Sequence, residues 1–359
     1  MPEDPFTGPL PTAWVGRATD EGIYRNSQSG GVVTALLDHL HRTGAVRASV
    51  VAIMMPGNPP RGDVLLALDQ KDLMVSQKSK YTPIPILKAI REIRKVDGNV
   101  AVVGLPCHIH GLLNLVDLFP ELRKKLRFRI GLICDRIMTT AAIDFLIGKT
   151  AGKRSCELVF RDKTRPSYPG NVTVATDLGR VSVRDARDRI DIKDFFTPAR
   201  CRICFDKMNI FSDVTVGDPH GIDGIDRING ESLVLVRSRV GRMLIESAME
   251  AKAVILQRTD VDRAHAGQLL DKKRRQWESF AVAWLKISDV NPWYFDKMLR
   301  GGSSDRREER LLRSAMMLDE FKSRQSLLRY YERKLSLLRF RNRIHPRRVA
   351  RLFKSGARV

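Results

Sequence analysis

Four of the five cysteines lie at positions that suit a shared metal centre. Cys107 follows the apolar run 99–104 (NVAVVG), and Cys134 follows the run 128–133 (FRIGLI). If these runs are neighbouring parallel strands, their carboxyl ends lie at one edge of a sheet, where ligands of open α/β sheets gather. A Cys-x-x-Cys pair at 201–204 adds two sulfurs that can turn toward one metal. Four thiolates are the ligands of a cubane iron–sulfur cluster.

The spacing of these cysteines leaves other interpretations open. Cys201 and Cys204 alone could form a redox dithiol or half of a zinc site. The apolar neighbours of Cys134 equally suit a buried structural cysteine. The fifth cysteine, Cys156, lies in a polar stretch (KRSCE), and we interpret it as structural.

A glycine-rich loop precedes a predicted amphipathic helix at 32–40. Ser29, Gly30 and Gly31 would leave backbone N–H groups exposed at the start of that helix, which suits a phosphate or pyrophosphate. Ser29 and Thr34 add hydroxyl groups. The loop matches neither a dinucleotide-binding fingerprint nor a Walker loop, and an ordinary helix cap explains it more simply.

Two further loops carry residues suited to a cofactor. Lys80 and Tyr81 place a cation and an aromatic ring before a helix, as a clamp on a phosphate or a flavin ring or as a solvated loop. Gly217 and Asp218 follow an apolar run and predict either a plain turn or a loop over a cofactor.

The sequence offers no strong proton donor for catalysis. His108 follows Cys107 directly, and His220 lies two residues after Asp218. Together with Tyr81 they are weak catalytic candidates, because no partner residue for them is evident from the sequence alone.

The composition indicates a globular protein with a strongly basic balance. The chain has 359 residues, 43% of them hydrophobic, and a net charge of +22. No apolar run approaches the roughly 18 residues of a membrane span, and the acidic, proline-rich start (MPEDP) is unlike a signal peptide. We therefore expect a cytoplasmic protein, in which cysteines serve metals or redox chemistry rather than disulfides.

Half of the net charge belongs to the C-terminal segment. Residues 301–359 contain 17 Lys or Arg against six Asp or Glu. Apolar residues recur among them with helical spacing, which predicts a basic amphipathic helix over 305–341. Residues 305–354 could then bind an anionic membrane surface or an acidic protein, or pack on the chain's own core.

Strand-like and helix-like runs alternate in the first half of the chain and predict an α/β fold, with a mostly parallel sheet flanked by helices. The second half predicts a mixed α+β region that includes a hairpin at 171–184. The expected regions are a surface arm at 1–22, an α/β flavin-binding region at 23–150, a mixed region with Cys-x-x-Cys at 151–300 and a basic helical appendage at 301–359.

Taken together, these segments resemble the coenzyme F-420 hydrogenase/dehydrogenase beta-subunit family. The residues that carry the resemblance are QSGGVVTALL at 28–37, SKY at 79–81, VVGLPC at 102–107, GLIC at 131–134, CRIC at 201–204, DVTVGD at 213–218 and SLVLV at 232–236. They occur in the family's order over about residues 22–256. The ordered set of four cysteines with the SGG loop makes the resemblance specific.

The resemblance implies an oxidoreductase subunit that binds FAD and one [4Fe–4S] cluster. It implies Cys107, Cys134, Cys201 and Cys204 as cluster ligands. The implied flavin-site candidates are Ser29, Gly30, Gly31, Thr34, Lys80, Tyr81, Gly104, Pro106, Gly217 and Asp218. Electrons would pass between the cluster and an organic substrate or a deazaflavin-type carrier.

The resemblance also implies a redox partner, either a ferredoxin-like protein or a hydrogenase or dehydrogenase subunit. Many relatives carry clustered cysteines before the SGG loop, and this sequence has none there. Relatives often have an aromatic residue after the Gly-Asp loop, where this sequence has Pro219 and His220. An alternative function is a zinc-stabilised nucleic-acid-binding protein, although no nucleic-acid motif is present and the basic residues lie apart from the cysteines.

Overall fold

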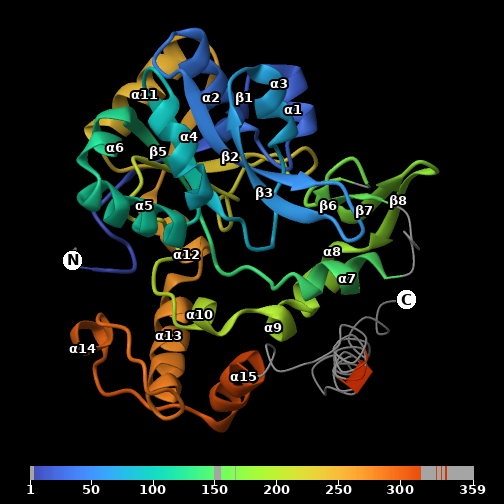
Figure 1. The fold of residues 1–359 in the computed structure, drawn as a ribbon, viewed down its shortest axis with the longest axis vertical. Coiled ribbons are helices and arrows are strands. Elements are labelled where there is room, and N and C mark those ends of the chain that lie inside the picture. Colours follow the sequence, from blue (N-terminus) through green and yellow to red (C-terminus); the bar gives the residue numbers. More distant parts are fainter. Residues whose placement is uncertain are drawn as a thin grey trace, which may run out of the picture.

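The computed structural model describes residues 4–148, 155–165 and 167–316, together with residues 329, 333, 336 and 337. A sheet of eight strands in the order β11-β1-β10-β9-β5-β4-β2-β3 runs through the molecule, and a sheet of three strands, β6-β7-β8, lies beside it (Figure 1). The strands are β1 Thr12–Ala18, β2 Ala48–Met55, β3 Arg61–Ala67, β4 Val100–Gly104, β5 Leu126–Leu132, β6 Glu157–Asp162, β7 Asn171–Thr176, β8 Gly179–Arg184, β9 Val214–Gly217, β10 Ser232–Val236 and β11 Val254–Thr259.

The middle of the large sheet is parallel, and its two sides are antiparallel. Strands β2, β4, β5 and β9 pair in parallel. Strand β3 is antiparallel to β2, while β10, β1 and β11 continue from β9 in antiparallel pairs. All five residues of β4 are buried, as expected for a parallel strand covered on both faces. The predicted α/β fold is confirmed.

Helices cover both faces of the large sheet (Figure 1). Their bounds are α1 Glu21–Asn26, α2 Val32–Arg42, α3 Gln70–Val75, η1 Ile86–Ala89, α4 Ile90–Lys95, α5 Pro106–Leu118, α6 Pro120–Lys125, α7 Ala141–Ile147, α8 Ala186–Asp191, α9 Lys193–Phe196, α10 Ala199–Arg202, α11 Arg239–Glu250, α12 Val261–Gly267, α13 Leu270–Leu285, α14 Phe295–Met298 and α15 Arg306–Met316. Alternate residues of β4 belong to different cores: Ala101 packs with residues of α2 and α11, and Val102 packs with residues of α4 and α5.

The predicted surface arm at 1–22 is wrong for its second half. Strand β1 lies inside the large sheet, between β10 and β11. Its residues Ala13, Val15 and Ala18 are buried. The prolines before residue 12 obscured a short alternating segment (TAWVGRA), whose apolar side becomes evident only when its partner strands are known.

Residues on both sides of position 150 contribute to the same large sheet. Strands β9, β10 and β11 follow that position, and β1 to β5 precede it. The predicted hairpin at 171–184 is present as β7 and β8. The sequence analysis did not identify β3, β6 or the long helix α13, which carries the fully buried Trp277.

Helix α15, which begins the predicted C-terminal appendage, packs on the body of the protein. Leu312 of α15 is completely buried among the residues of the core that includes Trp277. Lys286 forms an ion pair with Glu309 at 2.9 Å. The predicted helix at 305–341 is thus present over Arg306–Met316, and most of its remainder lies outside the described residues.

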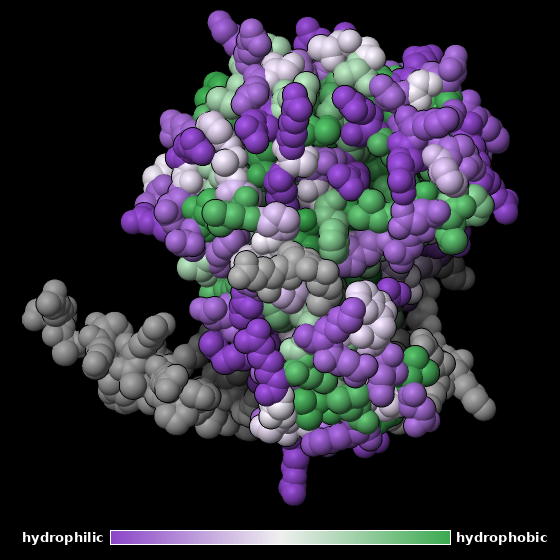
Figure 2. Space-filling model, turned by 90° about the vertical axis from the view of Figure 1, so that its left-hand side faces the viewer, coloured by the Kyte–Doolittle hydropathy of each residue, from purple (hydrophilic) through white to green (hydrophobic). Residues whose placement is uncertain are grey.

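Polar side chains cover most of the face shown in Figure 2, with smaller patches of apolar residues between them. In the described part of the chain, no helix combines the length and the hydropathy that crossing a membrane requires.

Candidate functional site

Two cysteines follow adjacent parallel strands. Strand β4 pairs with β5 up to Gly104 opposite Gly131. Cys107 lies in the first turn of α5, three residues after β4, and Cys134 lies two residues after β5. Because both strands end at the same edge of the sheet, both thiols lie on that edge.

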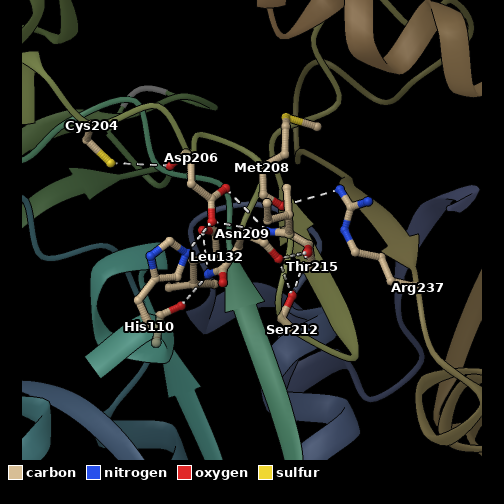
Figure 3. Close-up of polar contacts among 11 residues, drawn as sticks. His110, Leu132, Cys204, Asp206, Met208, Asn209, Ser212, Thr215 and Arg237 are labelled. Atoms are coloured by element: carbon tan, nitrogen blue, oxygen red, sulfur yellow. Dashed lines mark hydrogen bonds and ion pairs between the residues drawn. The ribbon is translucent and has the colours of Figure 1, made fainter. Parts of the chain in front are cut away.

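The loop after the Cys-x-x-Cys pair is bonded to both strand ends. The side-chain amide of Asn209 donates to the Gly104 carbonyl at 2.8 Å and to the Leu132 carbonyl at 3.2 Å (Figure 3). A Cβ at Gly131 would lie 2.5 Å from Asn209 Cγ, so only glycine fits there. The backbone N–H of Cys134 also donates to the Lys207 carbonyl at 2.9 Å. The loop therefore holds all three cysteine-bearing segments together.

Further hydrogen bonds stabilise the loop that follows Cys204. The Ser212 hydroxyl donates to the Asn209 carbonyl at 2.7 Å. The buried Asp206 carboxylate accepts the Ile210 N–H at 3.2 Å and lies 3.0 Å from Nε2 of His110 in α5 (Figure 3). Asp206 thus links the loop to the helix that begins with the Cys107 turn.

The four thiols share one electrostatic neighbourhood. Burial raises the pKa of Cys134 well above its usual value, and Cys204, Cys201 and Cys107 raise it further. Burial likewise raises the pKa of Cys204 to about 12, with Cys201 and Cys107 adding to the effect. Burial also raises the pKa of Cys107 and of Cys201. Such thiols gain most from a partner that favours the thiolate, as a metal does.

Cys156 stands apart from the other cysteines. It is buried in the core of the small sheet and forms an isolated β-bridge with Gly57. Its thiol is 3.5 Å from the Gly57 carbonyl. These contacts agree with the structural role predicted for it. Among the described residues, no group of three or more His, Cys, Asp or Glu side chains is already arranged around a metal position.

Cations surround the four thiols. Lys273 of α13 is 8% exposed, and its charge lowers the pKa of Cys204 and of Cys201 against the effect of burial. Lys193 pairs with Asp135 at 2.7 Å, next to Cys134. Burial opposes ionisation of Asp135, but Lys193 and Arg136 hold its pKa far below the usual range. Sequence analysis missed Lys273, because α13 itself was not predicted.

The glycine loop lies at the start of α2 and is explained largely by close packing. Gly31 has a φ of +74°. Gly30 lies between two strands, and an added Cβ would be 2.5 Å from the Gly16 carbonyl oxygen of β1 and 2.8 Å from the Ser232 N of β10. Thr34 is buried, and no side chain caps the start of α2. The first N–H groups of this helix are thus not taken by a capping side chain.

Lys163 was not identified from the sequence, yet its side chain donates hydrogen bonds to the backbone of the glycine loop and of neighbouring segments. Its ammonium donates to the carbonyls of Tyr24 at 2.7 Å, Ser29 at 2.9 Å and Asn229 at 2.9 Å. Burial lowers the pKa of Lys163 to about 8, although Asp226 acts in the opposite direction. The lysine follows β6 closely and ties the small sheet to the loop before α2.

The segment that contains Lys80 and Tyr81 lies against the same loop. The Ser79 N–H donates to Gln28 Oε1 at 2.9 Å. The Lys80 ammonium donates to the Gln77 carbonyl at 2.8 Å and also to the Ser76 carbonyl. Burial and the charge of Lys78 lower the pKa of Lys80 to about 7.

Tyr81 and Asp218, which are distant in the sequence, meet at Arg161. One guanidinium nitrogen of Arg161 donates to Asp218 Oδ2 at 2.7 Å and to the Tyr81 hydroxyl at 3.4 Å. Gly217, just before Asp218, packs so closely on Ile133 that an added Cβ would be 2.6 Å from Ile133 Cδ1. The Gly-Asp loop is therefore linked through Arg161 to Tyr81, and it packs on the strand end that leads to Cys134.

The two histidine candidates have different surroundings. The Leu105 N–H donates to Nδ1 of His108 at 3.2 Å, so this ring caps the start of α5 next to Pro106. Burial lowers the pKa of His108 to about 4, which leaves it neutral at pH 7. His220 lies at the surface. Partial burial of its ring, together with the charges of Lys207 and Arg161, lowers its pKa. His108 therefore suits a structural role better than proton donation.

Two family models match the chain in succession. Residues 13–91 match the model of the N-terminal part of the coenzyme F420 hydrogenase/dehydrogenase beta subunit, and residues 97–262 match the model of its C-terminal part. This chain belongs to that family. The first model covers the SGG loop and Tyr81, and the second covers all four clustered cysteines. The family resemblance inferred from the sequence is confirmed.

Named relatives include subunits of oxidoreductases from methanogens. One subunit of the F(420)H(2) dehydrogenase of Methanosarcina mazei is 25% identical over 252 residues, which are 69% of this chain and 66% of that protein. The beta subunit of the coenzyme F420 hydrogenase of Methanosarcina barkeri is 23% identical over 256 residues, 69% of this chain and 82% of that protein.

The fold also matches a solved structure in this family. A chain of the F420-reducing [NiFe] hydrogenase complex from Methanosarcina barkeri aligns with a TM-score of 0.60 and 20% identity, over 82% of this chain and all of that one. At this identity the match establishes the fold. The family assignment makes the chain an oxidoreductase subunit in general terms.

Proposed function

We propose that this family member is an FAD- and [4Fe–4S]-dependent oxidoreductase subunit that passes electrons between the cluster and an organic substrate or a deazaflavin-type carrier. The observation that carries the proposal is that the segments with Cys107, with Cys134 and with the Cys201–Cys204 pair are bonded together at the edge of the sheet. Besides burial, Cys107, Cys201 and Cys204 all raise the pKa of Cys134, and Cys156 does not belong to the group.

The donor set fits an iron–sulfur cluster in number and chemistry. Cys107, Cys134, Cys201 and Cys204 would hold it, since a cubane takes four cysteine thiolates. Lys273 and Lys207 lie close enough to influence these thiols or be influenced by them, and such cations offset the negative charge of a thiolate-bound cluster. The cluster would supply one-electron transfer.

The residues around the SGG loop fit a flavin nucleotide less specifically. The uncapped start of α2 offers N–H groups to a pyrophosphate, with Ser29, Gly30, Gly31 and Thr34 nearby. Lys80, Tyr81, Gly104, Pro106, Gly217 and Asp218 complete the proposed set. FAD would supply the conversion of a hydride into single electrons. The protein's own contribution would be to hold both groups at one edge of the sheet.

A redox partner is part of the proposal. Relatives are named as subunits of a dehydrogenase or a hydrogenase, so we propose that a partner subunit or a ferredoxin-like protein exchanges electrons with this chain. Cys107 is the most exposed of the four cysteines, so we propose the surface around it as the side on which that partner docks.

Anaerobic purification followed by flavin, iron, sulfide and zinc analysis tests the proposed cofactors. We expect a yellow-brown protein with about one FAD and about four iron and four sulfide ions per chain. A colourless protein with stoichiometric zinc would overturn the proposal and favour the zinc-stabilised alternative. If iron and sulfide are present without flavin after incubation with FAD, only the flavin part is wrong.

A further inference from the structure

Arg161 is a buried arginine that contacts both Tyr81 and Asp218 and has one guanidinium nitrogen without a hydrogen-bond partner. Arg161 of β6 is 2% exposed. Its Nε donates to the Pro169 carbonyl at 3.0 Å, and Nη1 serves Asp218 and Tyr81. Nη2 is buried without any hydrogen-bond partner. An unpaired charged donor in such a position is costly, so the site favours a further acceptor.

A second guanidinium lies over the ring of Tyr81. The guanidinium carbon of Arg189 in α8 is 4.7 Å from the centroid of the Tyr81 ring. Nε of Arg189 is buried and also has no hydrogen-bond partner. Within the described part of the chain, Arg189 makes no ion pair with a carboxylate, unlike Arg161. The two guanidinium groups thus have a single carboxylate, Asp218, near them, so one of the two positive charges is not neutralised by an ion pair in the described part of the chain.

The aromatic rings around this pair are partly open to solvent. Tyr81 and Tyr168 are half-buried, and the Tyr168 ring lies 5.2 Å from the guanidinium carbon of Arg161. Burial alone would raise the pKa of Tyr81, but Arg161 and Arg189 lower it below its usual value. The two guanidinium groups therefore make the surroundings of the Tyr81 hydroxyl electropositive.

We propose that Arg161, Arg189 and Tyr81 form a subsite for an oxyanion, a carboxylate or a phosphate, carried by the organic substrate. Guanidinium groups bind both anions through charge-assisted hydrogen bonds, and the neutral phenol of Tyr81 can donate a third. Asp218 occupies only Nη1 of Arg161 and leaves Nη2 for the ligand. Assignment to the substrate rests on the proposed function, because the Gly-Asp loop joins this subsite to the strand end before Cys134.

Binding of inorganic phosphate to the full chain tests the subsite directly. Calorimetry at constant ionic strength would compare the wild type, Arg189→Met and Arg187→Met. Arg187 is exposed on the same helix, so its replacement removes the same charge without touching Tyr81. We expect Arg189→Met to weaken phosphate binding at least tenfold and Arg187→Met to change it less than twofold. Equal losses in both variants, or no phosphate binding to the wild type, would overturn the proposal.

FAD content separates the two sources of such an anion. If the subsite holds a phosphate of FAD, Arg189→Met will lower the FAD content of the purified protein, and the assignment to substrate is then wrong. We expect both variants to retain wild-type FAD. If the wild type contains neither FAD nor cluster yet binds phosphate in a way that depends on Arg189, the oxyanion site stands and the proposed function fails.

Discussion

The side chain of Asn209 donates to the Gly104 carbonyl across 105 residues of sequence, at 2.8 Å. Gly104 ends the strand before the Cys107 turn, and Asn209 follows Cys204 by five residues. A φ of +53° at Asn209 directs its amide onto the strand ends, a backbone conformation that asparagine tolerates better than most residues. One side chain therefore aligns segments that each carry proposed ligands.

Replacing Asn209 with alanine should loosen this alignment. The Gly104 and Leu132 carbonyls would lose their donor, at a cost of roughly 1–3 kcal/mol in the free energy of unfolding. Urea unfolding would measure the cost, and iron content after gel filtration would measure cluster retention. Asn99→Ala is a matched control, since the exposed Asn99 amide also donates to a carbonyl, that of Ala45 at 3.2 Å. An Asn209→Ala protein as stable and iron-rich as Asn99→Ala would contradict this role.

Substitution of the cysteines distinguishes ligands from structural thiols. Replacing Cys107, Cys134, Cys201 or Cys204 individually with serine should strip or destabilise the cluster, because the hard hydroxyl is a poor ligand for iron in such a site. Cys156→Ser should keep full iron content. Iron and sulfide analysis of anaerobically prepared variants checks this. Loss of iron in Cys156→Ser, or its retention in one of the other four, would show that the ligand set is wrong.

Lys273 should tune the proposed cluster. Removing its charge by Lys273→Met should favour the oxidised, less negative cluster and lower its reduction potential, on the order of tens of millivolts for a charge this close in a partly buried site. A redox titration followed by electron paramagnetic resonance would measure the shift. Lys272→Met, at an exposed neighbouring position, should leave the potential unchanged. An unchanged potential in Lys273→Met would show that this cation lies too far from the cluster to matter.

The depressed pKa of Lys80 predicts a particular dependence of stability on pH. With a pKa of about 7 in the folded protein and about 10.4 when unfolded, the unfolded chain binds more protons between these values. The cost of burying this charged group is therefore relieved, and the stability of the fold rises, as pH increases from 7 toward 10, by at most about 1.4 kcal/mol per pH unit. Lys80→Met should lose that slope and gain most relative stability below pH 7. Denaturation curves at pH 6, 8 and 9.5 would test it, and identical slopes in both proteins would refute it.

Truncation of the basic segment should be made after Met316. Leu312 is buried in the core, so cutting after Gly302 would uncover apolar surface. A chain ending at Met316 should fold with its cofactors but lose binding to anionic liposomes or to an acidic partner. Co-sedimentation at low and high salt checks this, because contacts of exposed charges weaken with ionic strength. If the full chain binds neither, or binds equally in high salt, the segment does not act through its charge.

The sequence was sufficient to predict the strands and cysteines of the site where a local apolar pattern is followed directly by a residue type suited to metal binding. The apolar runs at 99–104 and 128–133 predicted β4 and β5, and thereby the edge at which Cys107 and Cys134 lie. It was insufficient for residues whose roles depend on distant contacts. Arg161 looks like one basic residue among 63 until Tyr81 and Asp218 are placed beside it.

Glycines show a different limit of sequence reasoning. Gly30 and Gly31 suited a phosphate site by pattern, yet the structure gives Gly30 a packing role between β1 and β10. A variant such as Gly30→Val would therefore disturb the sheet whether or not a flavin binds. A glycine at position 30 indicated that a side chain would not fit there. It did not indicate whether strand backbone or a bound ligand lies against the glycine.

The position of β1 has a consequence for how the protein is made. Residues 12–18 leave the ribosome well before both of their partner strands, β10 and β11, which lie beyond residue 231. Until those strands emerge, the nascent chain carries an unpaired, half-apolar strand, the kind of segment that slows folding and invites aggregation. Synthesis of this protein should accordingly depend on protection of residues 12–18 by a chaperone until β11 has been made.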